Sequence, residues 1–133
     1  MANQLDLYST VMNMQYLLYH KCHDLHKVCE LYEDDAIFAI HRPLGGPVCV
    51  KGRDKIEQWW RAYCKGDILF ESSIIESMHV MRLSDNMYST TGLVSRLVSA
   101  DSTDRERVLK TDVFELNDSA KIAMHEITVC PTP

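Results

Sequence analysis

The second half of the chain consists of four long segments with the composition of β-strands. They cover residues 68–83, 87–100, 105–116 and 121–130, and the short polar stretches SDN, ADSTD and NDSA separate them. Runs of this kind that end at Asn, Asp and Ser clusters are typical of strands joined by turns. No repeat, linker or low-complexity tract interrupts the series. This half of the chain therefore predicts a four-stranded antiparallel meander.

The first 31 residues have a helical period instead. Apolar side chains recur every three or four positions between residues 4 and 31, at Leu7, Val11, Met14, Leu17, Leu18, Leu25, Val28, Cys29 and Leu31. Asp24 is expected to cap a second helix, because its carboxylate can accept hydrogen bonds from the amides of the following turn. We therefore predict two helices in this region.

A short hairpin and a third helix join these two halves. Residues 36–41 have strand composition, PLGGP at 43–47 predicts a turn, and residues 48–50 return as a strand. Residues 52–63 then form an amphipathic helix, with one apolar side made of Ile56, Trp59, Trp60 and Tyr63. The order predicts an α+β fold in which three N-terminal helices pack on a curved antiparallel sheet.

Composition narrows the class of protein. A chain of 133 residues with 46% hydrophobic content fits a single domain, residues 1–133. The net charge of −5, without any Lys/Arg run, argues against nucleic acid as a partner. We expect neither a leader nor a membrane span, because no basic segment precedes an apolar run and no apolar stretch has the length needed to cross a bilayer, and we expect a cytoplasmic protein. The five cysteines include no CxxC pair, so reduced thiols are expected.

Two motifs give the chain a resemblance to a known superfamily. LYEDDAIF (31–38), placed at the end of the second helix, and VKGRDKIEQWW (50–60), at the start of the third, resemble the nuclear transport factor 2-like superfamily. Within it the chain looks most like the SnoaL-like and ketosteroid isomerase branch, from Tyr16 to Val129. The resemblance implies a cone-shaped fold around an apolar pocket. That fold hosts isomerases, cyclases, hydrolases, dehydratases and non-catalytic assembly domains.

The resemblance also implies roles for individual residues. Tyr16 keeps the family's spacing to the DDA motif and resembles the oxyanion-hole tyrosine. KTDVFELND places Asp112 on the family's second oxyanion donor, an aspartic acid that stays protonated. Tyr32 and Trp60 resemble the aromatic residues that support the tyrosine.

One expected residue is missing. The family's base is an aspartate at the end of the first strand, and this chain has Ile40 or Arg42 there, depending on the alignment. His41 can replace it, because a neutral imidazole titrates near working pH; the alternative is an exposed loop histidine. Arg42 binds an acidic substrate group at the pocket mouth or pairs with a surface carboxylate.

The residues themselves indicate an acid/base pair on the last two strands. With a loop at 117–120, Leu116 faces Lys121 and Asp112 lies directly across from His125, about 5 Å away at Cβ. The two side chains can then share a proton. Because the neighbours of Asp112 are largely apolar, burial without a partner would keep its carboxyl neutral. The alternative is a solvated pair on the other sheet face.

Several further polar residues are candidates for the site. His20 follows Tyr16 by four residues and lines the cavity or packs between helices. His20, His23 and His26 do not share a helix face past the break at Asp24, so we predict no metal site. Glu71 and Glu76 fall on opposite strand faces, and one of them points inward. Arg96 resembles the strand arginine of the superfamily's epoxide hydrolases, but Val98 replaces their aspartate.

These observations together predict a cofactor-independent isomerase or cyclase, since no phosphate loop or nucleophile motif is present. Its reaction is acid/base rearrangement of a hydrophobic polycyclic carbonyl compound: a polyketide, terpenoid, meroterpenoid or steroid-like molecule. The alternatives are a non-catalytic dimerising or ligand-binding module and a dehydratase or epoxide hydrolase variant. Apolar residues on both strand faces predict a homodimer through the convex sheet face. The predicted catalytic residues are Tyr16, Asp112, His125 and His41, and the predicted substrate-binding residues are His20, Tyr32, Trp60, Phe114 and Arg42.

Overall fold

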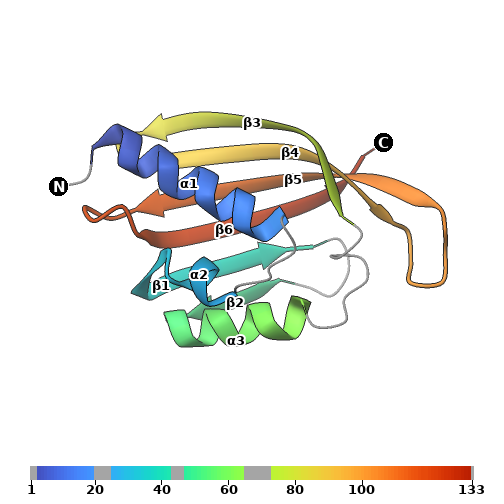
Figure 1. The fold of residues 1–133 in the computed structure, drawn as a ribbon, viewed down its shortest axis with the longest axis horizontal. Helices are drawn as coiled ribbons and strands as arrows, with labels where there is room; N and C mark the ends of the chain where they lie inside the picture. Colours follow the sequence, from blue (N-terminus) through green and yellow to red (C-terminus); the bar gives the residue numbers. More distant parts are fainter. Residues whose placement is uncertain (1–2, 20–24, 43–46, 65–72, 133) are drawn as a thin grey trace.

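The computed structural model describes residues 3–19, 25–42, 47–64 and 73–132. The helices are α1 (Gln4–Tyr19), α2 (Leu25–Cys29) and α3 (Arg53–Cys64). The strands are β1 (Tyr32–His41), β2 (Val48–Lys51), β3 (Ile74–Ser84), β4 (Met87–Leu97), β5 (Arg105–Leu116) and β6 (Ile122–Pro131). In the described ranges, the helices and strands follow one another in the predicted order (Figure 1).

The strands form one six-stranded sheet in the order β2-β1-β6-β5-β4-β3. The meander of β3 to β6 is antiparallel, as predicted, but β1 pairs with β6 in the parallel direction. The sheet is therefore mixed, and the prediction of an antiparallel sheet was wrong at this junction. Periodicity reports which face a side chain occupies, whereas it carries no information on which distant strands become neighbours.

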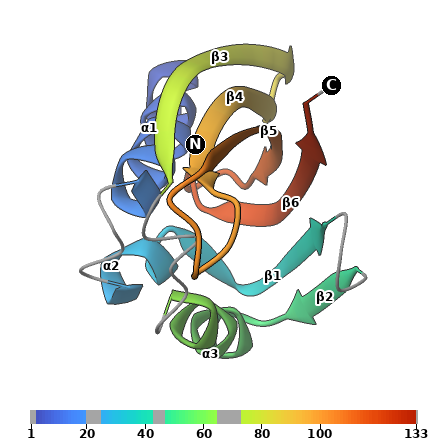
Figure 2. The ribbon, with the colours of Figure 1, turned by 90° about the vertical axis from the view of Figure 1, so that its right-hand side faces the viewer.

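One sheet face carries the helices, and we call it the inner face. Gln15 of α1 bonds Thr90 of β4, and Trp60 of α3 packs on Phe38 of β1. The pairings Thr90 to Asp112, Asp112 to Ile127 and Ile127 to Ile40 place these contacts on the same face of the sheet. Figure 2 shows how strongly the strands bend. The inner face therefore holds the core, which includes Val11, Met14, Tyr32, Phe38, Ile56, Trp60, Phe114 and Ile127.

Strand β1 begins four residues earlier than predicted. Tyr32 and Ala36 are both buried, while Asp34 and Asp35 between them are exposed. The placement of LYEDDAIF at the end of the second helix is therefore wrong from Tyr32 onward, although a spacing of four between buried residues is also typical of a helix. In the structure, an irregularity in the pairing with β6 between Tyr32 and Ile37 produces this spacing within a strand.

Two other expectations concern cysteines and membranes. The cysteines with described side chains, Cys29, Cys49 and Cys130, form no disulfide within the described part of the chain. No helix in the described ranges combines the length and apolar character required to cross a membrane.

The entry to α3 depends on a glycine. Gly52 has φ of +100°, a value that residues with a side chain rarely adopt. Its N–H donates to the Ala36 carbonyl at 2.8 Å, and its own carbonyl accepts from the Ile56 N–H at 3.0 Å. Gly52 therefore joins the start of α3 to β1 and sets the position of Trp60.

Replacing Gly52 by alanine is expected to lower the unfolding free energy by about 1–2 kcal/mol, because a Cβ strains this backbone conformation. Urea denaturation of Gly52→Ala measures the change. Lys51→Ala, at the exposed neighbouring position, serves as the matched control and should remain close to the parent. Equal losses in the two variants would contradict the role assigned to the glycine.

Candidate functional site

Four ionisable side chains from three neighbouring strands form a chain of hydrogen bonds on the inner face. Lys110 of β5 places its Nζ 3.0 Å from Asp112 Oδ1 and 3.2 Å from Oδ2. Asp112 Oδ2 lies 2.8 Å from His125 Nε2 of β6. His125 Nδ1 lies 2.7 Å from the Tyr32 hydroxyl of β1. We call these residues the Lys110–Tyr32 chain.

The chain is enclosed by apolar side chains. Asp112 is 1% exposed and His125 and Tyr32 are 0% exposed, while the Lys110 side chain retains 15%. Phe114 stacks on the His125 ring with centroids 4.3 Å apart, and Phe38 meets the same ring edge-on at 5.5 Å. Lys110 is therefore the member of the chain through which the cluster reaches solvent.

The prediction that Asp112 and His125 lie together on the inner face is confirmed, but the predicted register was wrong by two residues. His125 pairs with Phe114, and Asp112 pairs with Ile127. One residue comes from the turn, where the Asn117 N–H donates to the Lys121 carbonyl, and one from an irregularity between Glu115 and Leu116. A shift of two residues keeps both side chains on the same face, so they meet diagonally.

The charge state of Asp112 differs from the prediction of a neutral acid. Burial alone would raise the pKa of its carboxyl, but the Lys110 ammonium and the hydrogen bond from His125 outweigh this and bring the pKa from 3.8 to about 2. The ammonium beside it therefore favours the carboxylate form of Asp112 over the predicted protonated oxyanion donor. The sequence contained the signal, since Lys110 lies two residues away on the same strand face.

The two other members stay neutral. Burial lowers the pKa of His125 despite the favourable Asp112 charge, so the imidazole is uncharged at pH 7. Burial raises the pKa of the Tyr32 hydroxyl well above 10.0, and the nearby Trp60 opposes this rise in part. One cation and one anion thus balance each other in the chain, as burial of charge requires. A histidine held between a carboxylate and a hydroxyl is a geometry that can move a proton.

Tyr16 does not join this cluster, and its assignment to an inner-face oxyanion hole was wrong. Its side chain is 62% exposed, whereas Met14 and Gln15 beside it are buried. Successive helical residues differ by about 100° in direction, so the position one residue earlier points inward. Gln15 Nε2 donates to Thr90 Oγ1 at 2.9 Å, and Thr90 pairs with Asp112 across β4 and β5. Sequence reasoning missed Gln15 and Thr90 as neighbours of the site.

His41 is also displaced from the predicted site. It lies at the end of β1 on the outer face, half exposed, with Nε2 3.8 Å from Glu126 Oε1. It therefore does not converge with His125. Arg42 follows β1 and is half-buried, and its Nε makes no hydrogen bond to the part of the chain that the structure describes. His20 lies outside the described residues.

The aromatic residues predicted to bind substrate are Tyr32, Trp60 and Phe114, and all three are buried. Trp60 is 2% exposed and packs on Phe38 with ring centroids 5.4 Å apart, and Phe114 covers the His125 ring. Tyr32 bonds His125 instead of supporting Tyr16. Phe114 and Tyr32 therefore contact His125 directly, and Trp60 lies behind Phe38 and Tyr32. Their role toward a substrate stays a prediction.

The remaining polar candidates lie elsewhere. Glu76 pairs with Arg107 at 2.9 Å, and Arg96 pairs with Glu106 at 3.1 Å, six residues along β5 from Asp112. Glu71 and His23 lie outside the described residues. His26 is exposed and sits 3.1 Å from Glu30. In the described ranges, no group of three or more His, Cys, Asp or Glu residues could hold a metal ion.

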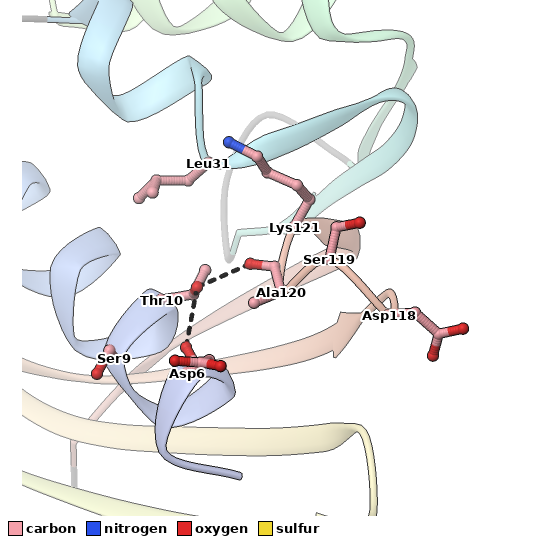
Figure 3. A pocket seen from close by; sticks show the side chains of 8 residues that line it. All are labelled: Asp6, Ser9, Thr10, Leu31, Asp118, Ser119, Ala120 and Lys121. Carbon is pink, nitrogen blue, oxygen red and sulfur yellow. Dashed lines mark hydrogen bonds between the residues drawn. The ribbon is translucent and has the colours of Figure 1, made fainter. Parts of the chain in front are cut away.

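A surface hollow of about 530 Å³ lies away from this chain (Figure 3). It is bordered by the start of α1, by Leu31 and by the β5–β6 turn. There the Thr10 hydroxyl bonds the Ala120 carbonyl at 2.7 Å. None of the predicted site residues lines it. The contact fixes α1 against the turn that precedes β6, and so helps to hold the helix over the inner face.

The unfolding free energy is expected to fall on both sides of neutral pH. As the pH drops below 6.5, the unfolded chain protonates the histidine that the folded protein keeps neutral, and this stability is lost. Below about pH 4 the unfolded chain also protonates Asp112, whereas in the folded protein the pKa of Asp112 is about 2, so further stability is lost. Above about 10 the unfolded chain ionises the tyrosine first, because the folded pKa of Tyr32 is raised.

Chemical denaturation at a series of pH values between 3 and 10.5 measures this profile. Asp112→Asn should flatten the profile below about pH 4 and keep the loss that His125 causes above it, whereas Asp85→Asn, at a fully exposed carboxyl, should retain both. A parent protein equally stable at pH 7 and pH 3 would overturn the assigned charge states.

Comparison with solved structures places this geometry in a known fold, although no protein-family model and no curated protein matches the sequence. An NTF2-like protein from Anabaena variabilis superposes with a TM-score of 0.74 at 12% identity, covering 99% of this chain and 96% of that chain. SalBIII, an epoxide hydrolase/cyclase-like enzyme in pyran ring formation in the polyether salinomycin, gives 0.68 at 15% identity, with 99% and 100% covered.

A steroid delta-isomerase from Pseudomonas aeruginosa gives a TM-score of 0.58 at 16% identity, covering 96% of this chain and 81% of that chain. Identities this low establish the fold and leave the reaction open. The predicted resemblance is confirmed at this level: the chain has the nuclear transport factor 2-like fold that SnoaL-like cyclases and ketosteroid isomerases share.

Proposed function

We propose that the protein is a cofactor-independent isomerase or cyclase that rearranges a hydrophobic polycyclic carbonyl compound by acid/base chemistry. The substrate class is a polyketide, terpenoid, meroterpenoid or steroid-like molecule of secondary metabolism. The observation that carries the proposal is the Lys110–Tyr32 chain, in which a neutral histidine lies between a carboxylate and a hydroxyl inside an apolar core.

The burial of the Lys110–Tyr32 chain indicates a functional role. An ion pair enclosed in an apolar interior contributes little net stability, because both charges lose their hydration. Titratable groups with shifted pKa values and specific charge partners are more frequent at functional sites than elsewhere. Asp112, His125 and Tyr32 all have shifted pKa values, and each touches the next. The chain therefore supports acid/base chemistry better than it supports a purely structural role.

The geometry suggests how a proton would move. The Tyr32 oxygen takes a proton from a carbon next to the substrate carbonyl while its own proton passes to His125 Nδ1. The imidazolium formed in this way is stabilised by the Asp112 carboxylate 2.8 Å away. Reversal of the two transfers returns a proton to another carbon, which completes an isomerisation with no net change in the protein. Because Tyr32 is closed off from solvent, substrate entry requires the covering apolar side chains to move aside.

Proton exchange with solvent tests this function without knowledge of the natural substrate. In D₂O the parent protein should catalyse deuterium incorporation next to the carbonyl of at least one ketone in a panel of polycyclic ketones, followed by proton NMR. His125→Gln, Asp112→Asn and Tyr32→Phe should each lower the catalysed rate by about 100-fold or more. His26→Gln, at an exposed histidine, is the matched control and should keep the parent rate. Unchanged rates in the three variants, or no catalysis on any ketone, would refute the proposal.

A specific observation favours a second candidate, the dimerising or ligand-binding module. Ile37, Met81 and Leu109 share the outer sheet face and are 43%, 62% and 41% exposed. These three residues lie on separate strands of that face, and a partner that covered the face would bury all of them. We propose that this face joins two copies in a homodimer. A dehydratase or epoxide hydrolase variant remains a third reading, since it would use the same acid/base chain.

The dimer has its own test. Leu109→Glu should weaken self-association at least tenfold, because a charge enters the middle of an apolar contact. Analytical ultracentrifugation over a concentration series measures the change. Leu5→Glu changes an apolar residue that is 70% exposed on α1, and it should leave the mass unchanged. A monomeric parent protein would rule out the interface.

A further inference from the structure

The contact between Lys110 and Asp112 affects every hydrogen bond of the Lys110–Tyr32 chain. Its ammonium lies within hydrogen-bond distance of both carboxylate oxygens, and its side chain is mostly buried on the inner face. Gly92 faces it from β4 and Val129 from β6, so neither adjoining strand offers another charge there. Among the described residues, Lys110 is therefore the cation that contacts the Asp112 carboxylate.

The direction of every hydrogen bond in the chain follows from the charge on Asp112. An ionised carboxylate only accepts hydrogen bonds, so the 2.8 Å contact requires a proton on His125 Nε2. A neutral imidazole carries one ring proton, so Nδ1 has a lone pair. At 2.7 Å from Nδ1, the Tyr32 hydroxyl must then donate. The protons point from Tyr32 toward His125 and from His125 toward Asp112.

We propose that Lys110 is a positioning residue that sets this direction: its ammonium keeps Asp112 an acceptor, and through Asp112 it holds His125 in the Nε2–H form with Nδ1 accepting from Tyr32. The importance of this direction for a reaction rests on the proposed function, because a Tyr32 hydroxyl that donates to His125 is the state from which Tyr32 can take up a substrate proton. The protonation pattern itself does not depend on any substrate.

Loss of the Lys110 charge should reverse the direction of the hydrogen bond between His125 and Tyr32. The buried Asp112 and His125 pair would then carry a net negative charge, and binding one proton removes it. If that proton resides on Asp112, the new hydroxyl donates to Nε2 and the ring proton moves to Nδ1. If it resides on His125, both ring nitrogens are protonated. In either case Nδ1 carries a proton, and the Tyr32 oxygen becomes the acceptor.

No other described group near the pair can replace the lysine. From α1 and β4 the neighbours are Gln15 and Thr90, which are neutral. From β1 the pair meets Tyr32, whose own ionisation is affected by Cys29 of α2. A negative charge on either of these groups would add to that of Asp112. The ammonium of Lys110 is thus the cation on which the pattern depends.

Nitrogen-15 NMR of protein labelled at histidine tests the proposal, because the shift of each ring nitrogen reports whether it carries a proton. His125→Gln identifies the His125 signals. At pH 7 the parent and Lys110→Arg should show a protonated Nε2 and an unprotonated Nδ1, whereas Lys110→Met and Lys110→Gln should show a protonated Nδ1. Lys121→Met removes a lysine outside the chain and should match the parent.

A protonated Nδ1 in the parent, or an unprotonated Nδ1 in the folded neutral variants, would overturn the proposal. If neither neutral variant folds, the parent and Lys110→Arg spectra can still overturn the proposal, because a protonated Nδ1 in either would contradict the pattern. No substrate enters these measurements, so a protein with the expected spectra that exchanges no ketone proton would keep this inference and lose the proposed function. Where exchange is observed, Lys110→Met should also move its pH profile, which a merely structural lysine would leave in place.

Discussion

The enclosed carboxylate of Asp112 is the constraint on which the inner face of this protein depends. An ion at 1% exposure has lost its water, and the fold must supply equivalent partners. One partner, Lys110, comes from the same strand, and the other, His125, comes from the next strand. His125 in turn bonds Tyr32 on the strand beyond. The partners of this one charge therefore connect β5, β6 and β1, and they include the parallel pair of β1 and β6 that joins the hairpin to the meander.

Sequence reasoning succeeded for the acid/base pair because strand geometry tolerates one kind of error. The predicted register was wrong by two residues, and a strand repeats its facing every two residues. Asp112 and His125 therefore stayed on one face. Helix geometry offers no such tolerance, since each residue turns by about 100°. A one-residue difference in phase was enough to put Tyr16 in solvent and Gln15 against the sheet.

Other features were beyond the reach of a local pattern. The parallel pairing of β1 with β6 joins Phe38 to His125, 87 positions further along the chain. The irregularity in β1 gives its buried residues a helix-like spacing within a strand, so periodicity does not mark the start of the strand at Tyr32. The charge on Asp112 is a different case, because the prediction considered its apolar neighbours along the strand and left out Lys110 on the same face. Considering residues two positions away would have predicted the ionised form from the sequence.

The proposed active site and the proposed dimer interface use opposite faces of the same strand, β5. The inward residues of β5 are Lys110, Asp112 and Phe114, and the outward residues include Leu109. A second copy bound to the outer face would leave the hydrogen-bond chain untouched and would hold β5 more rigidly. Acid/base groups work best when their distances are fixed by the surrounding structure. The proposed dimer and the proposed catalysis therefore need not compete in this fold, because rigidity gained on the outer face would stabilise the alignment of protons on the inner one.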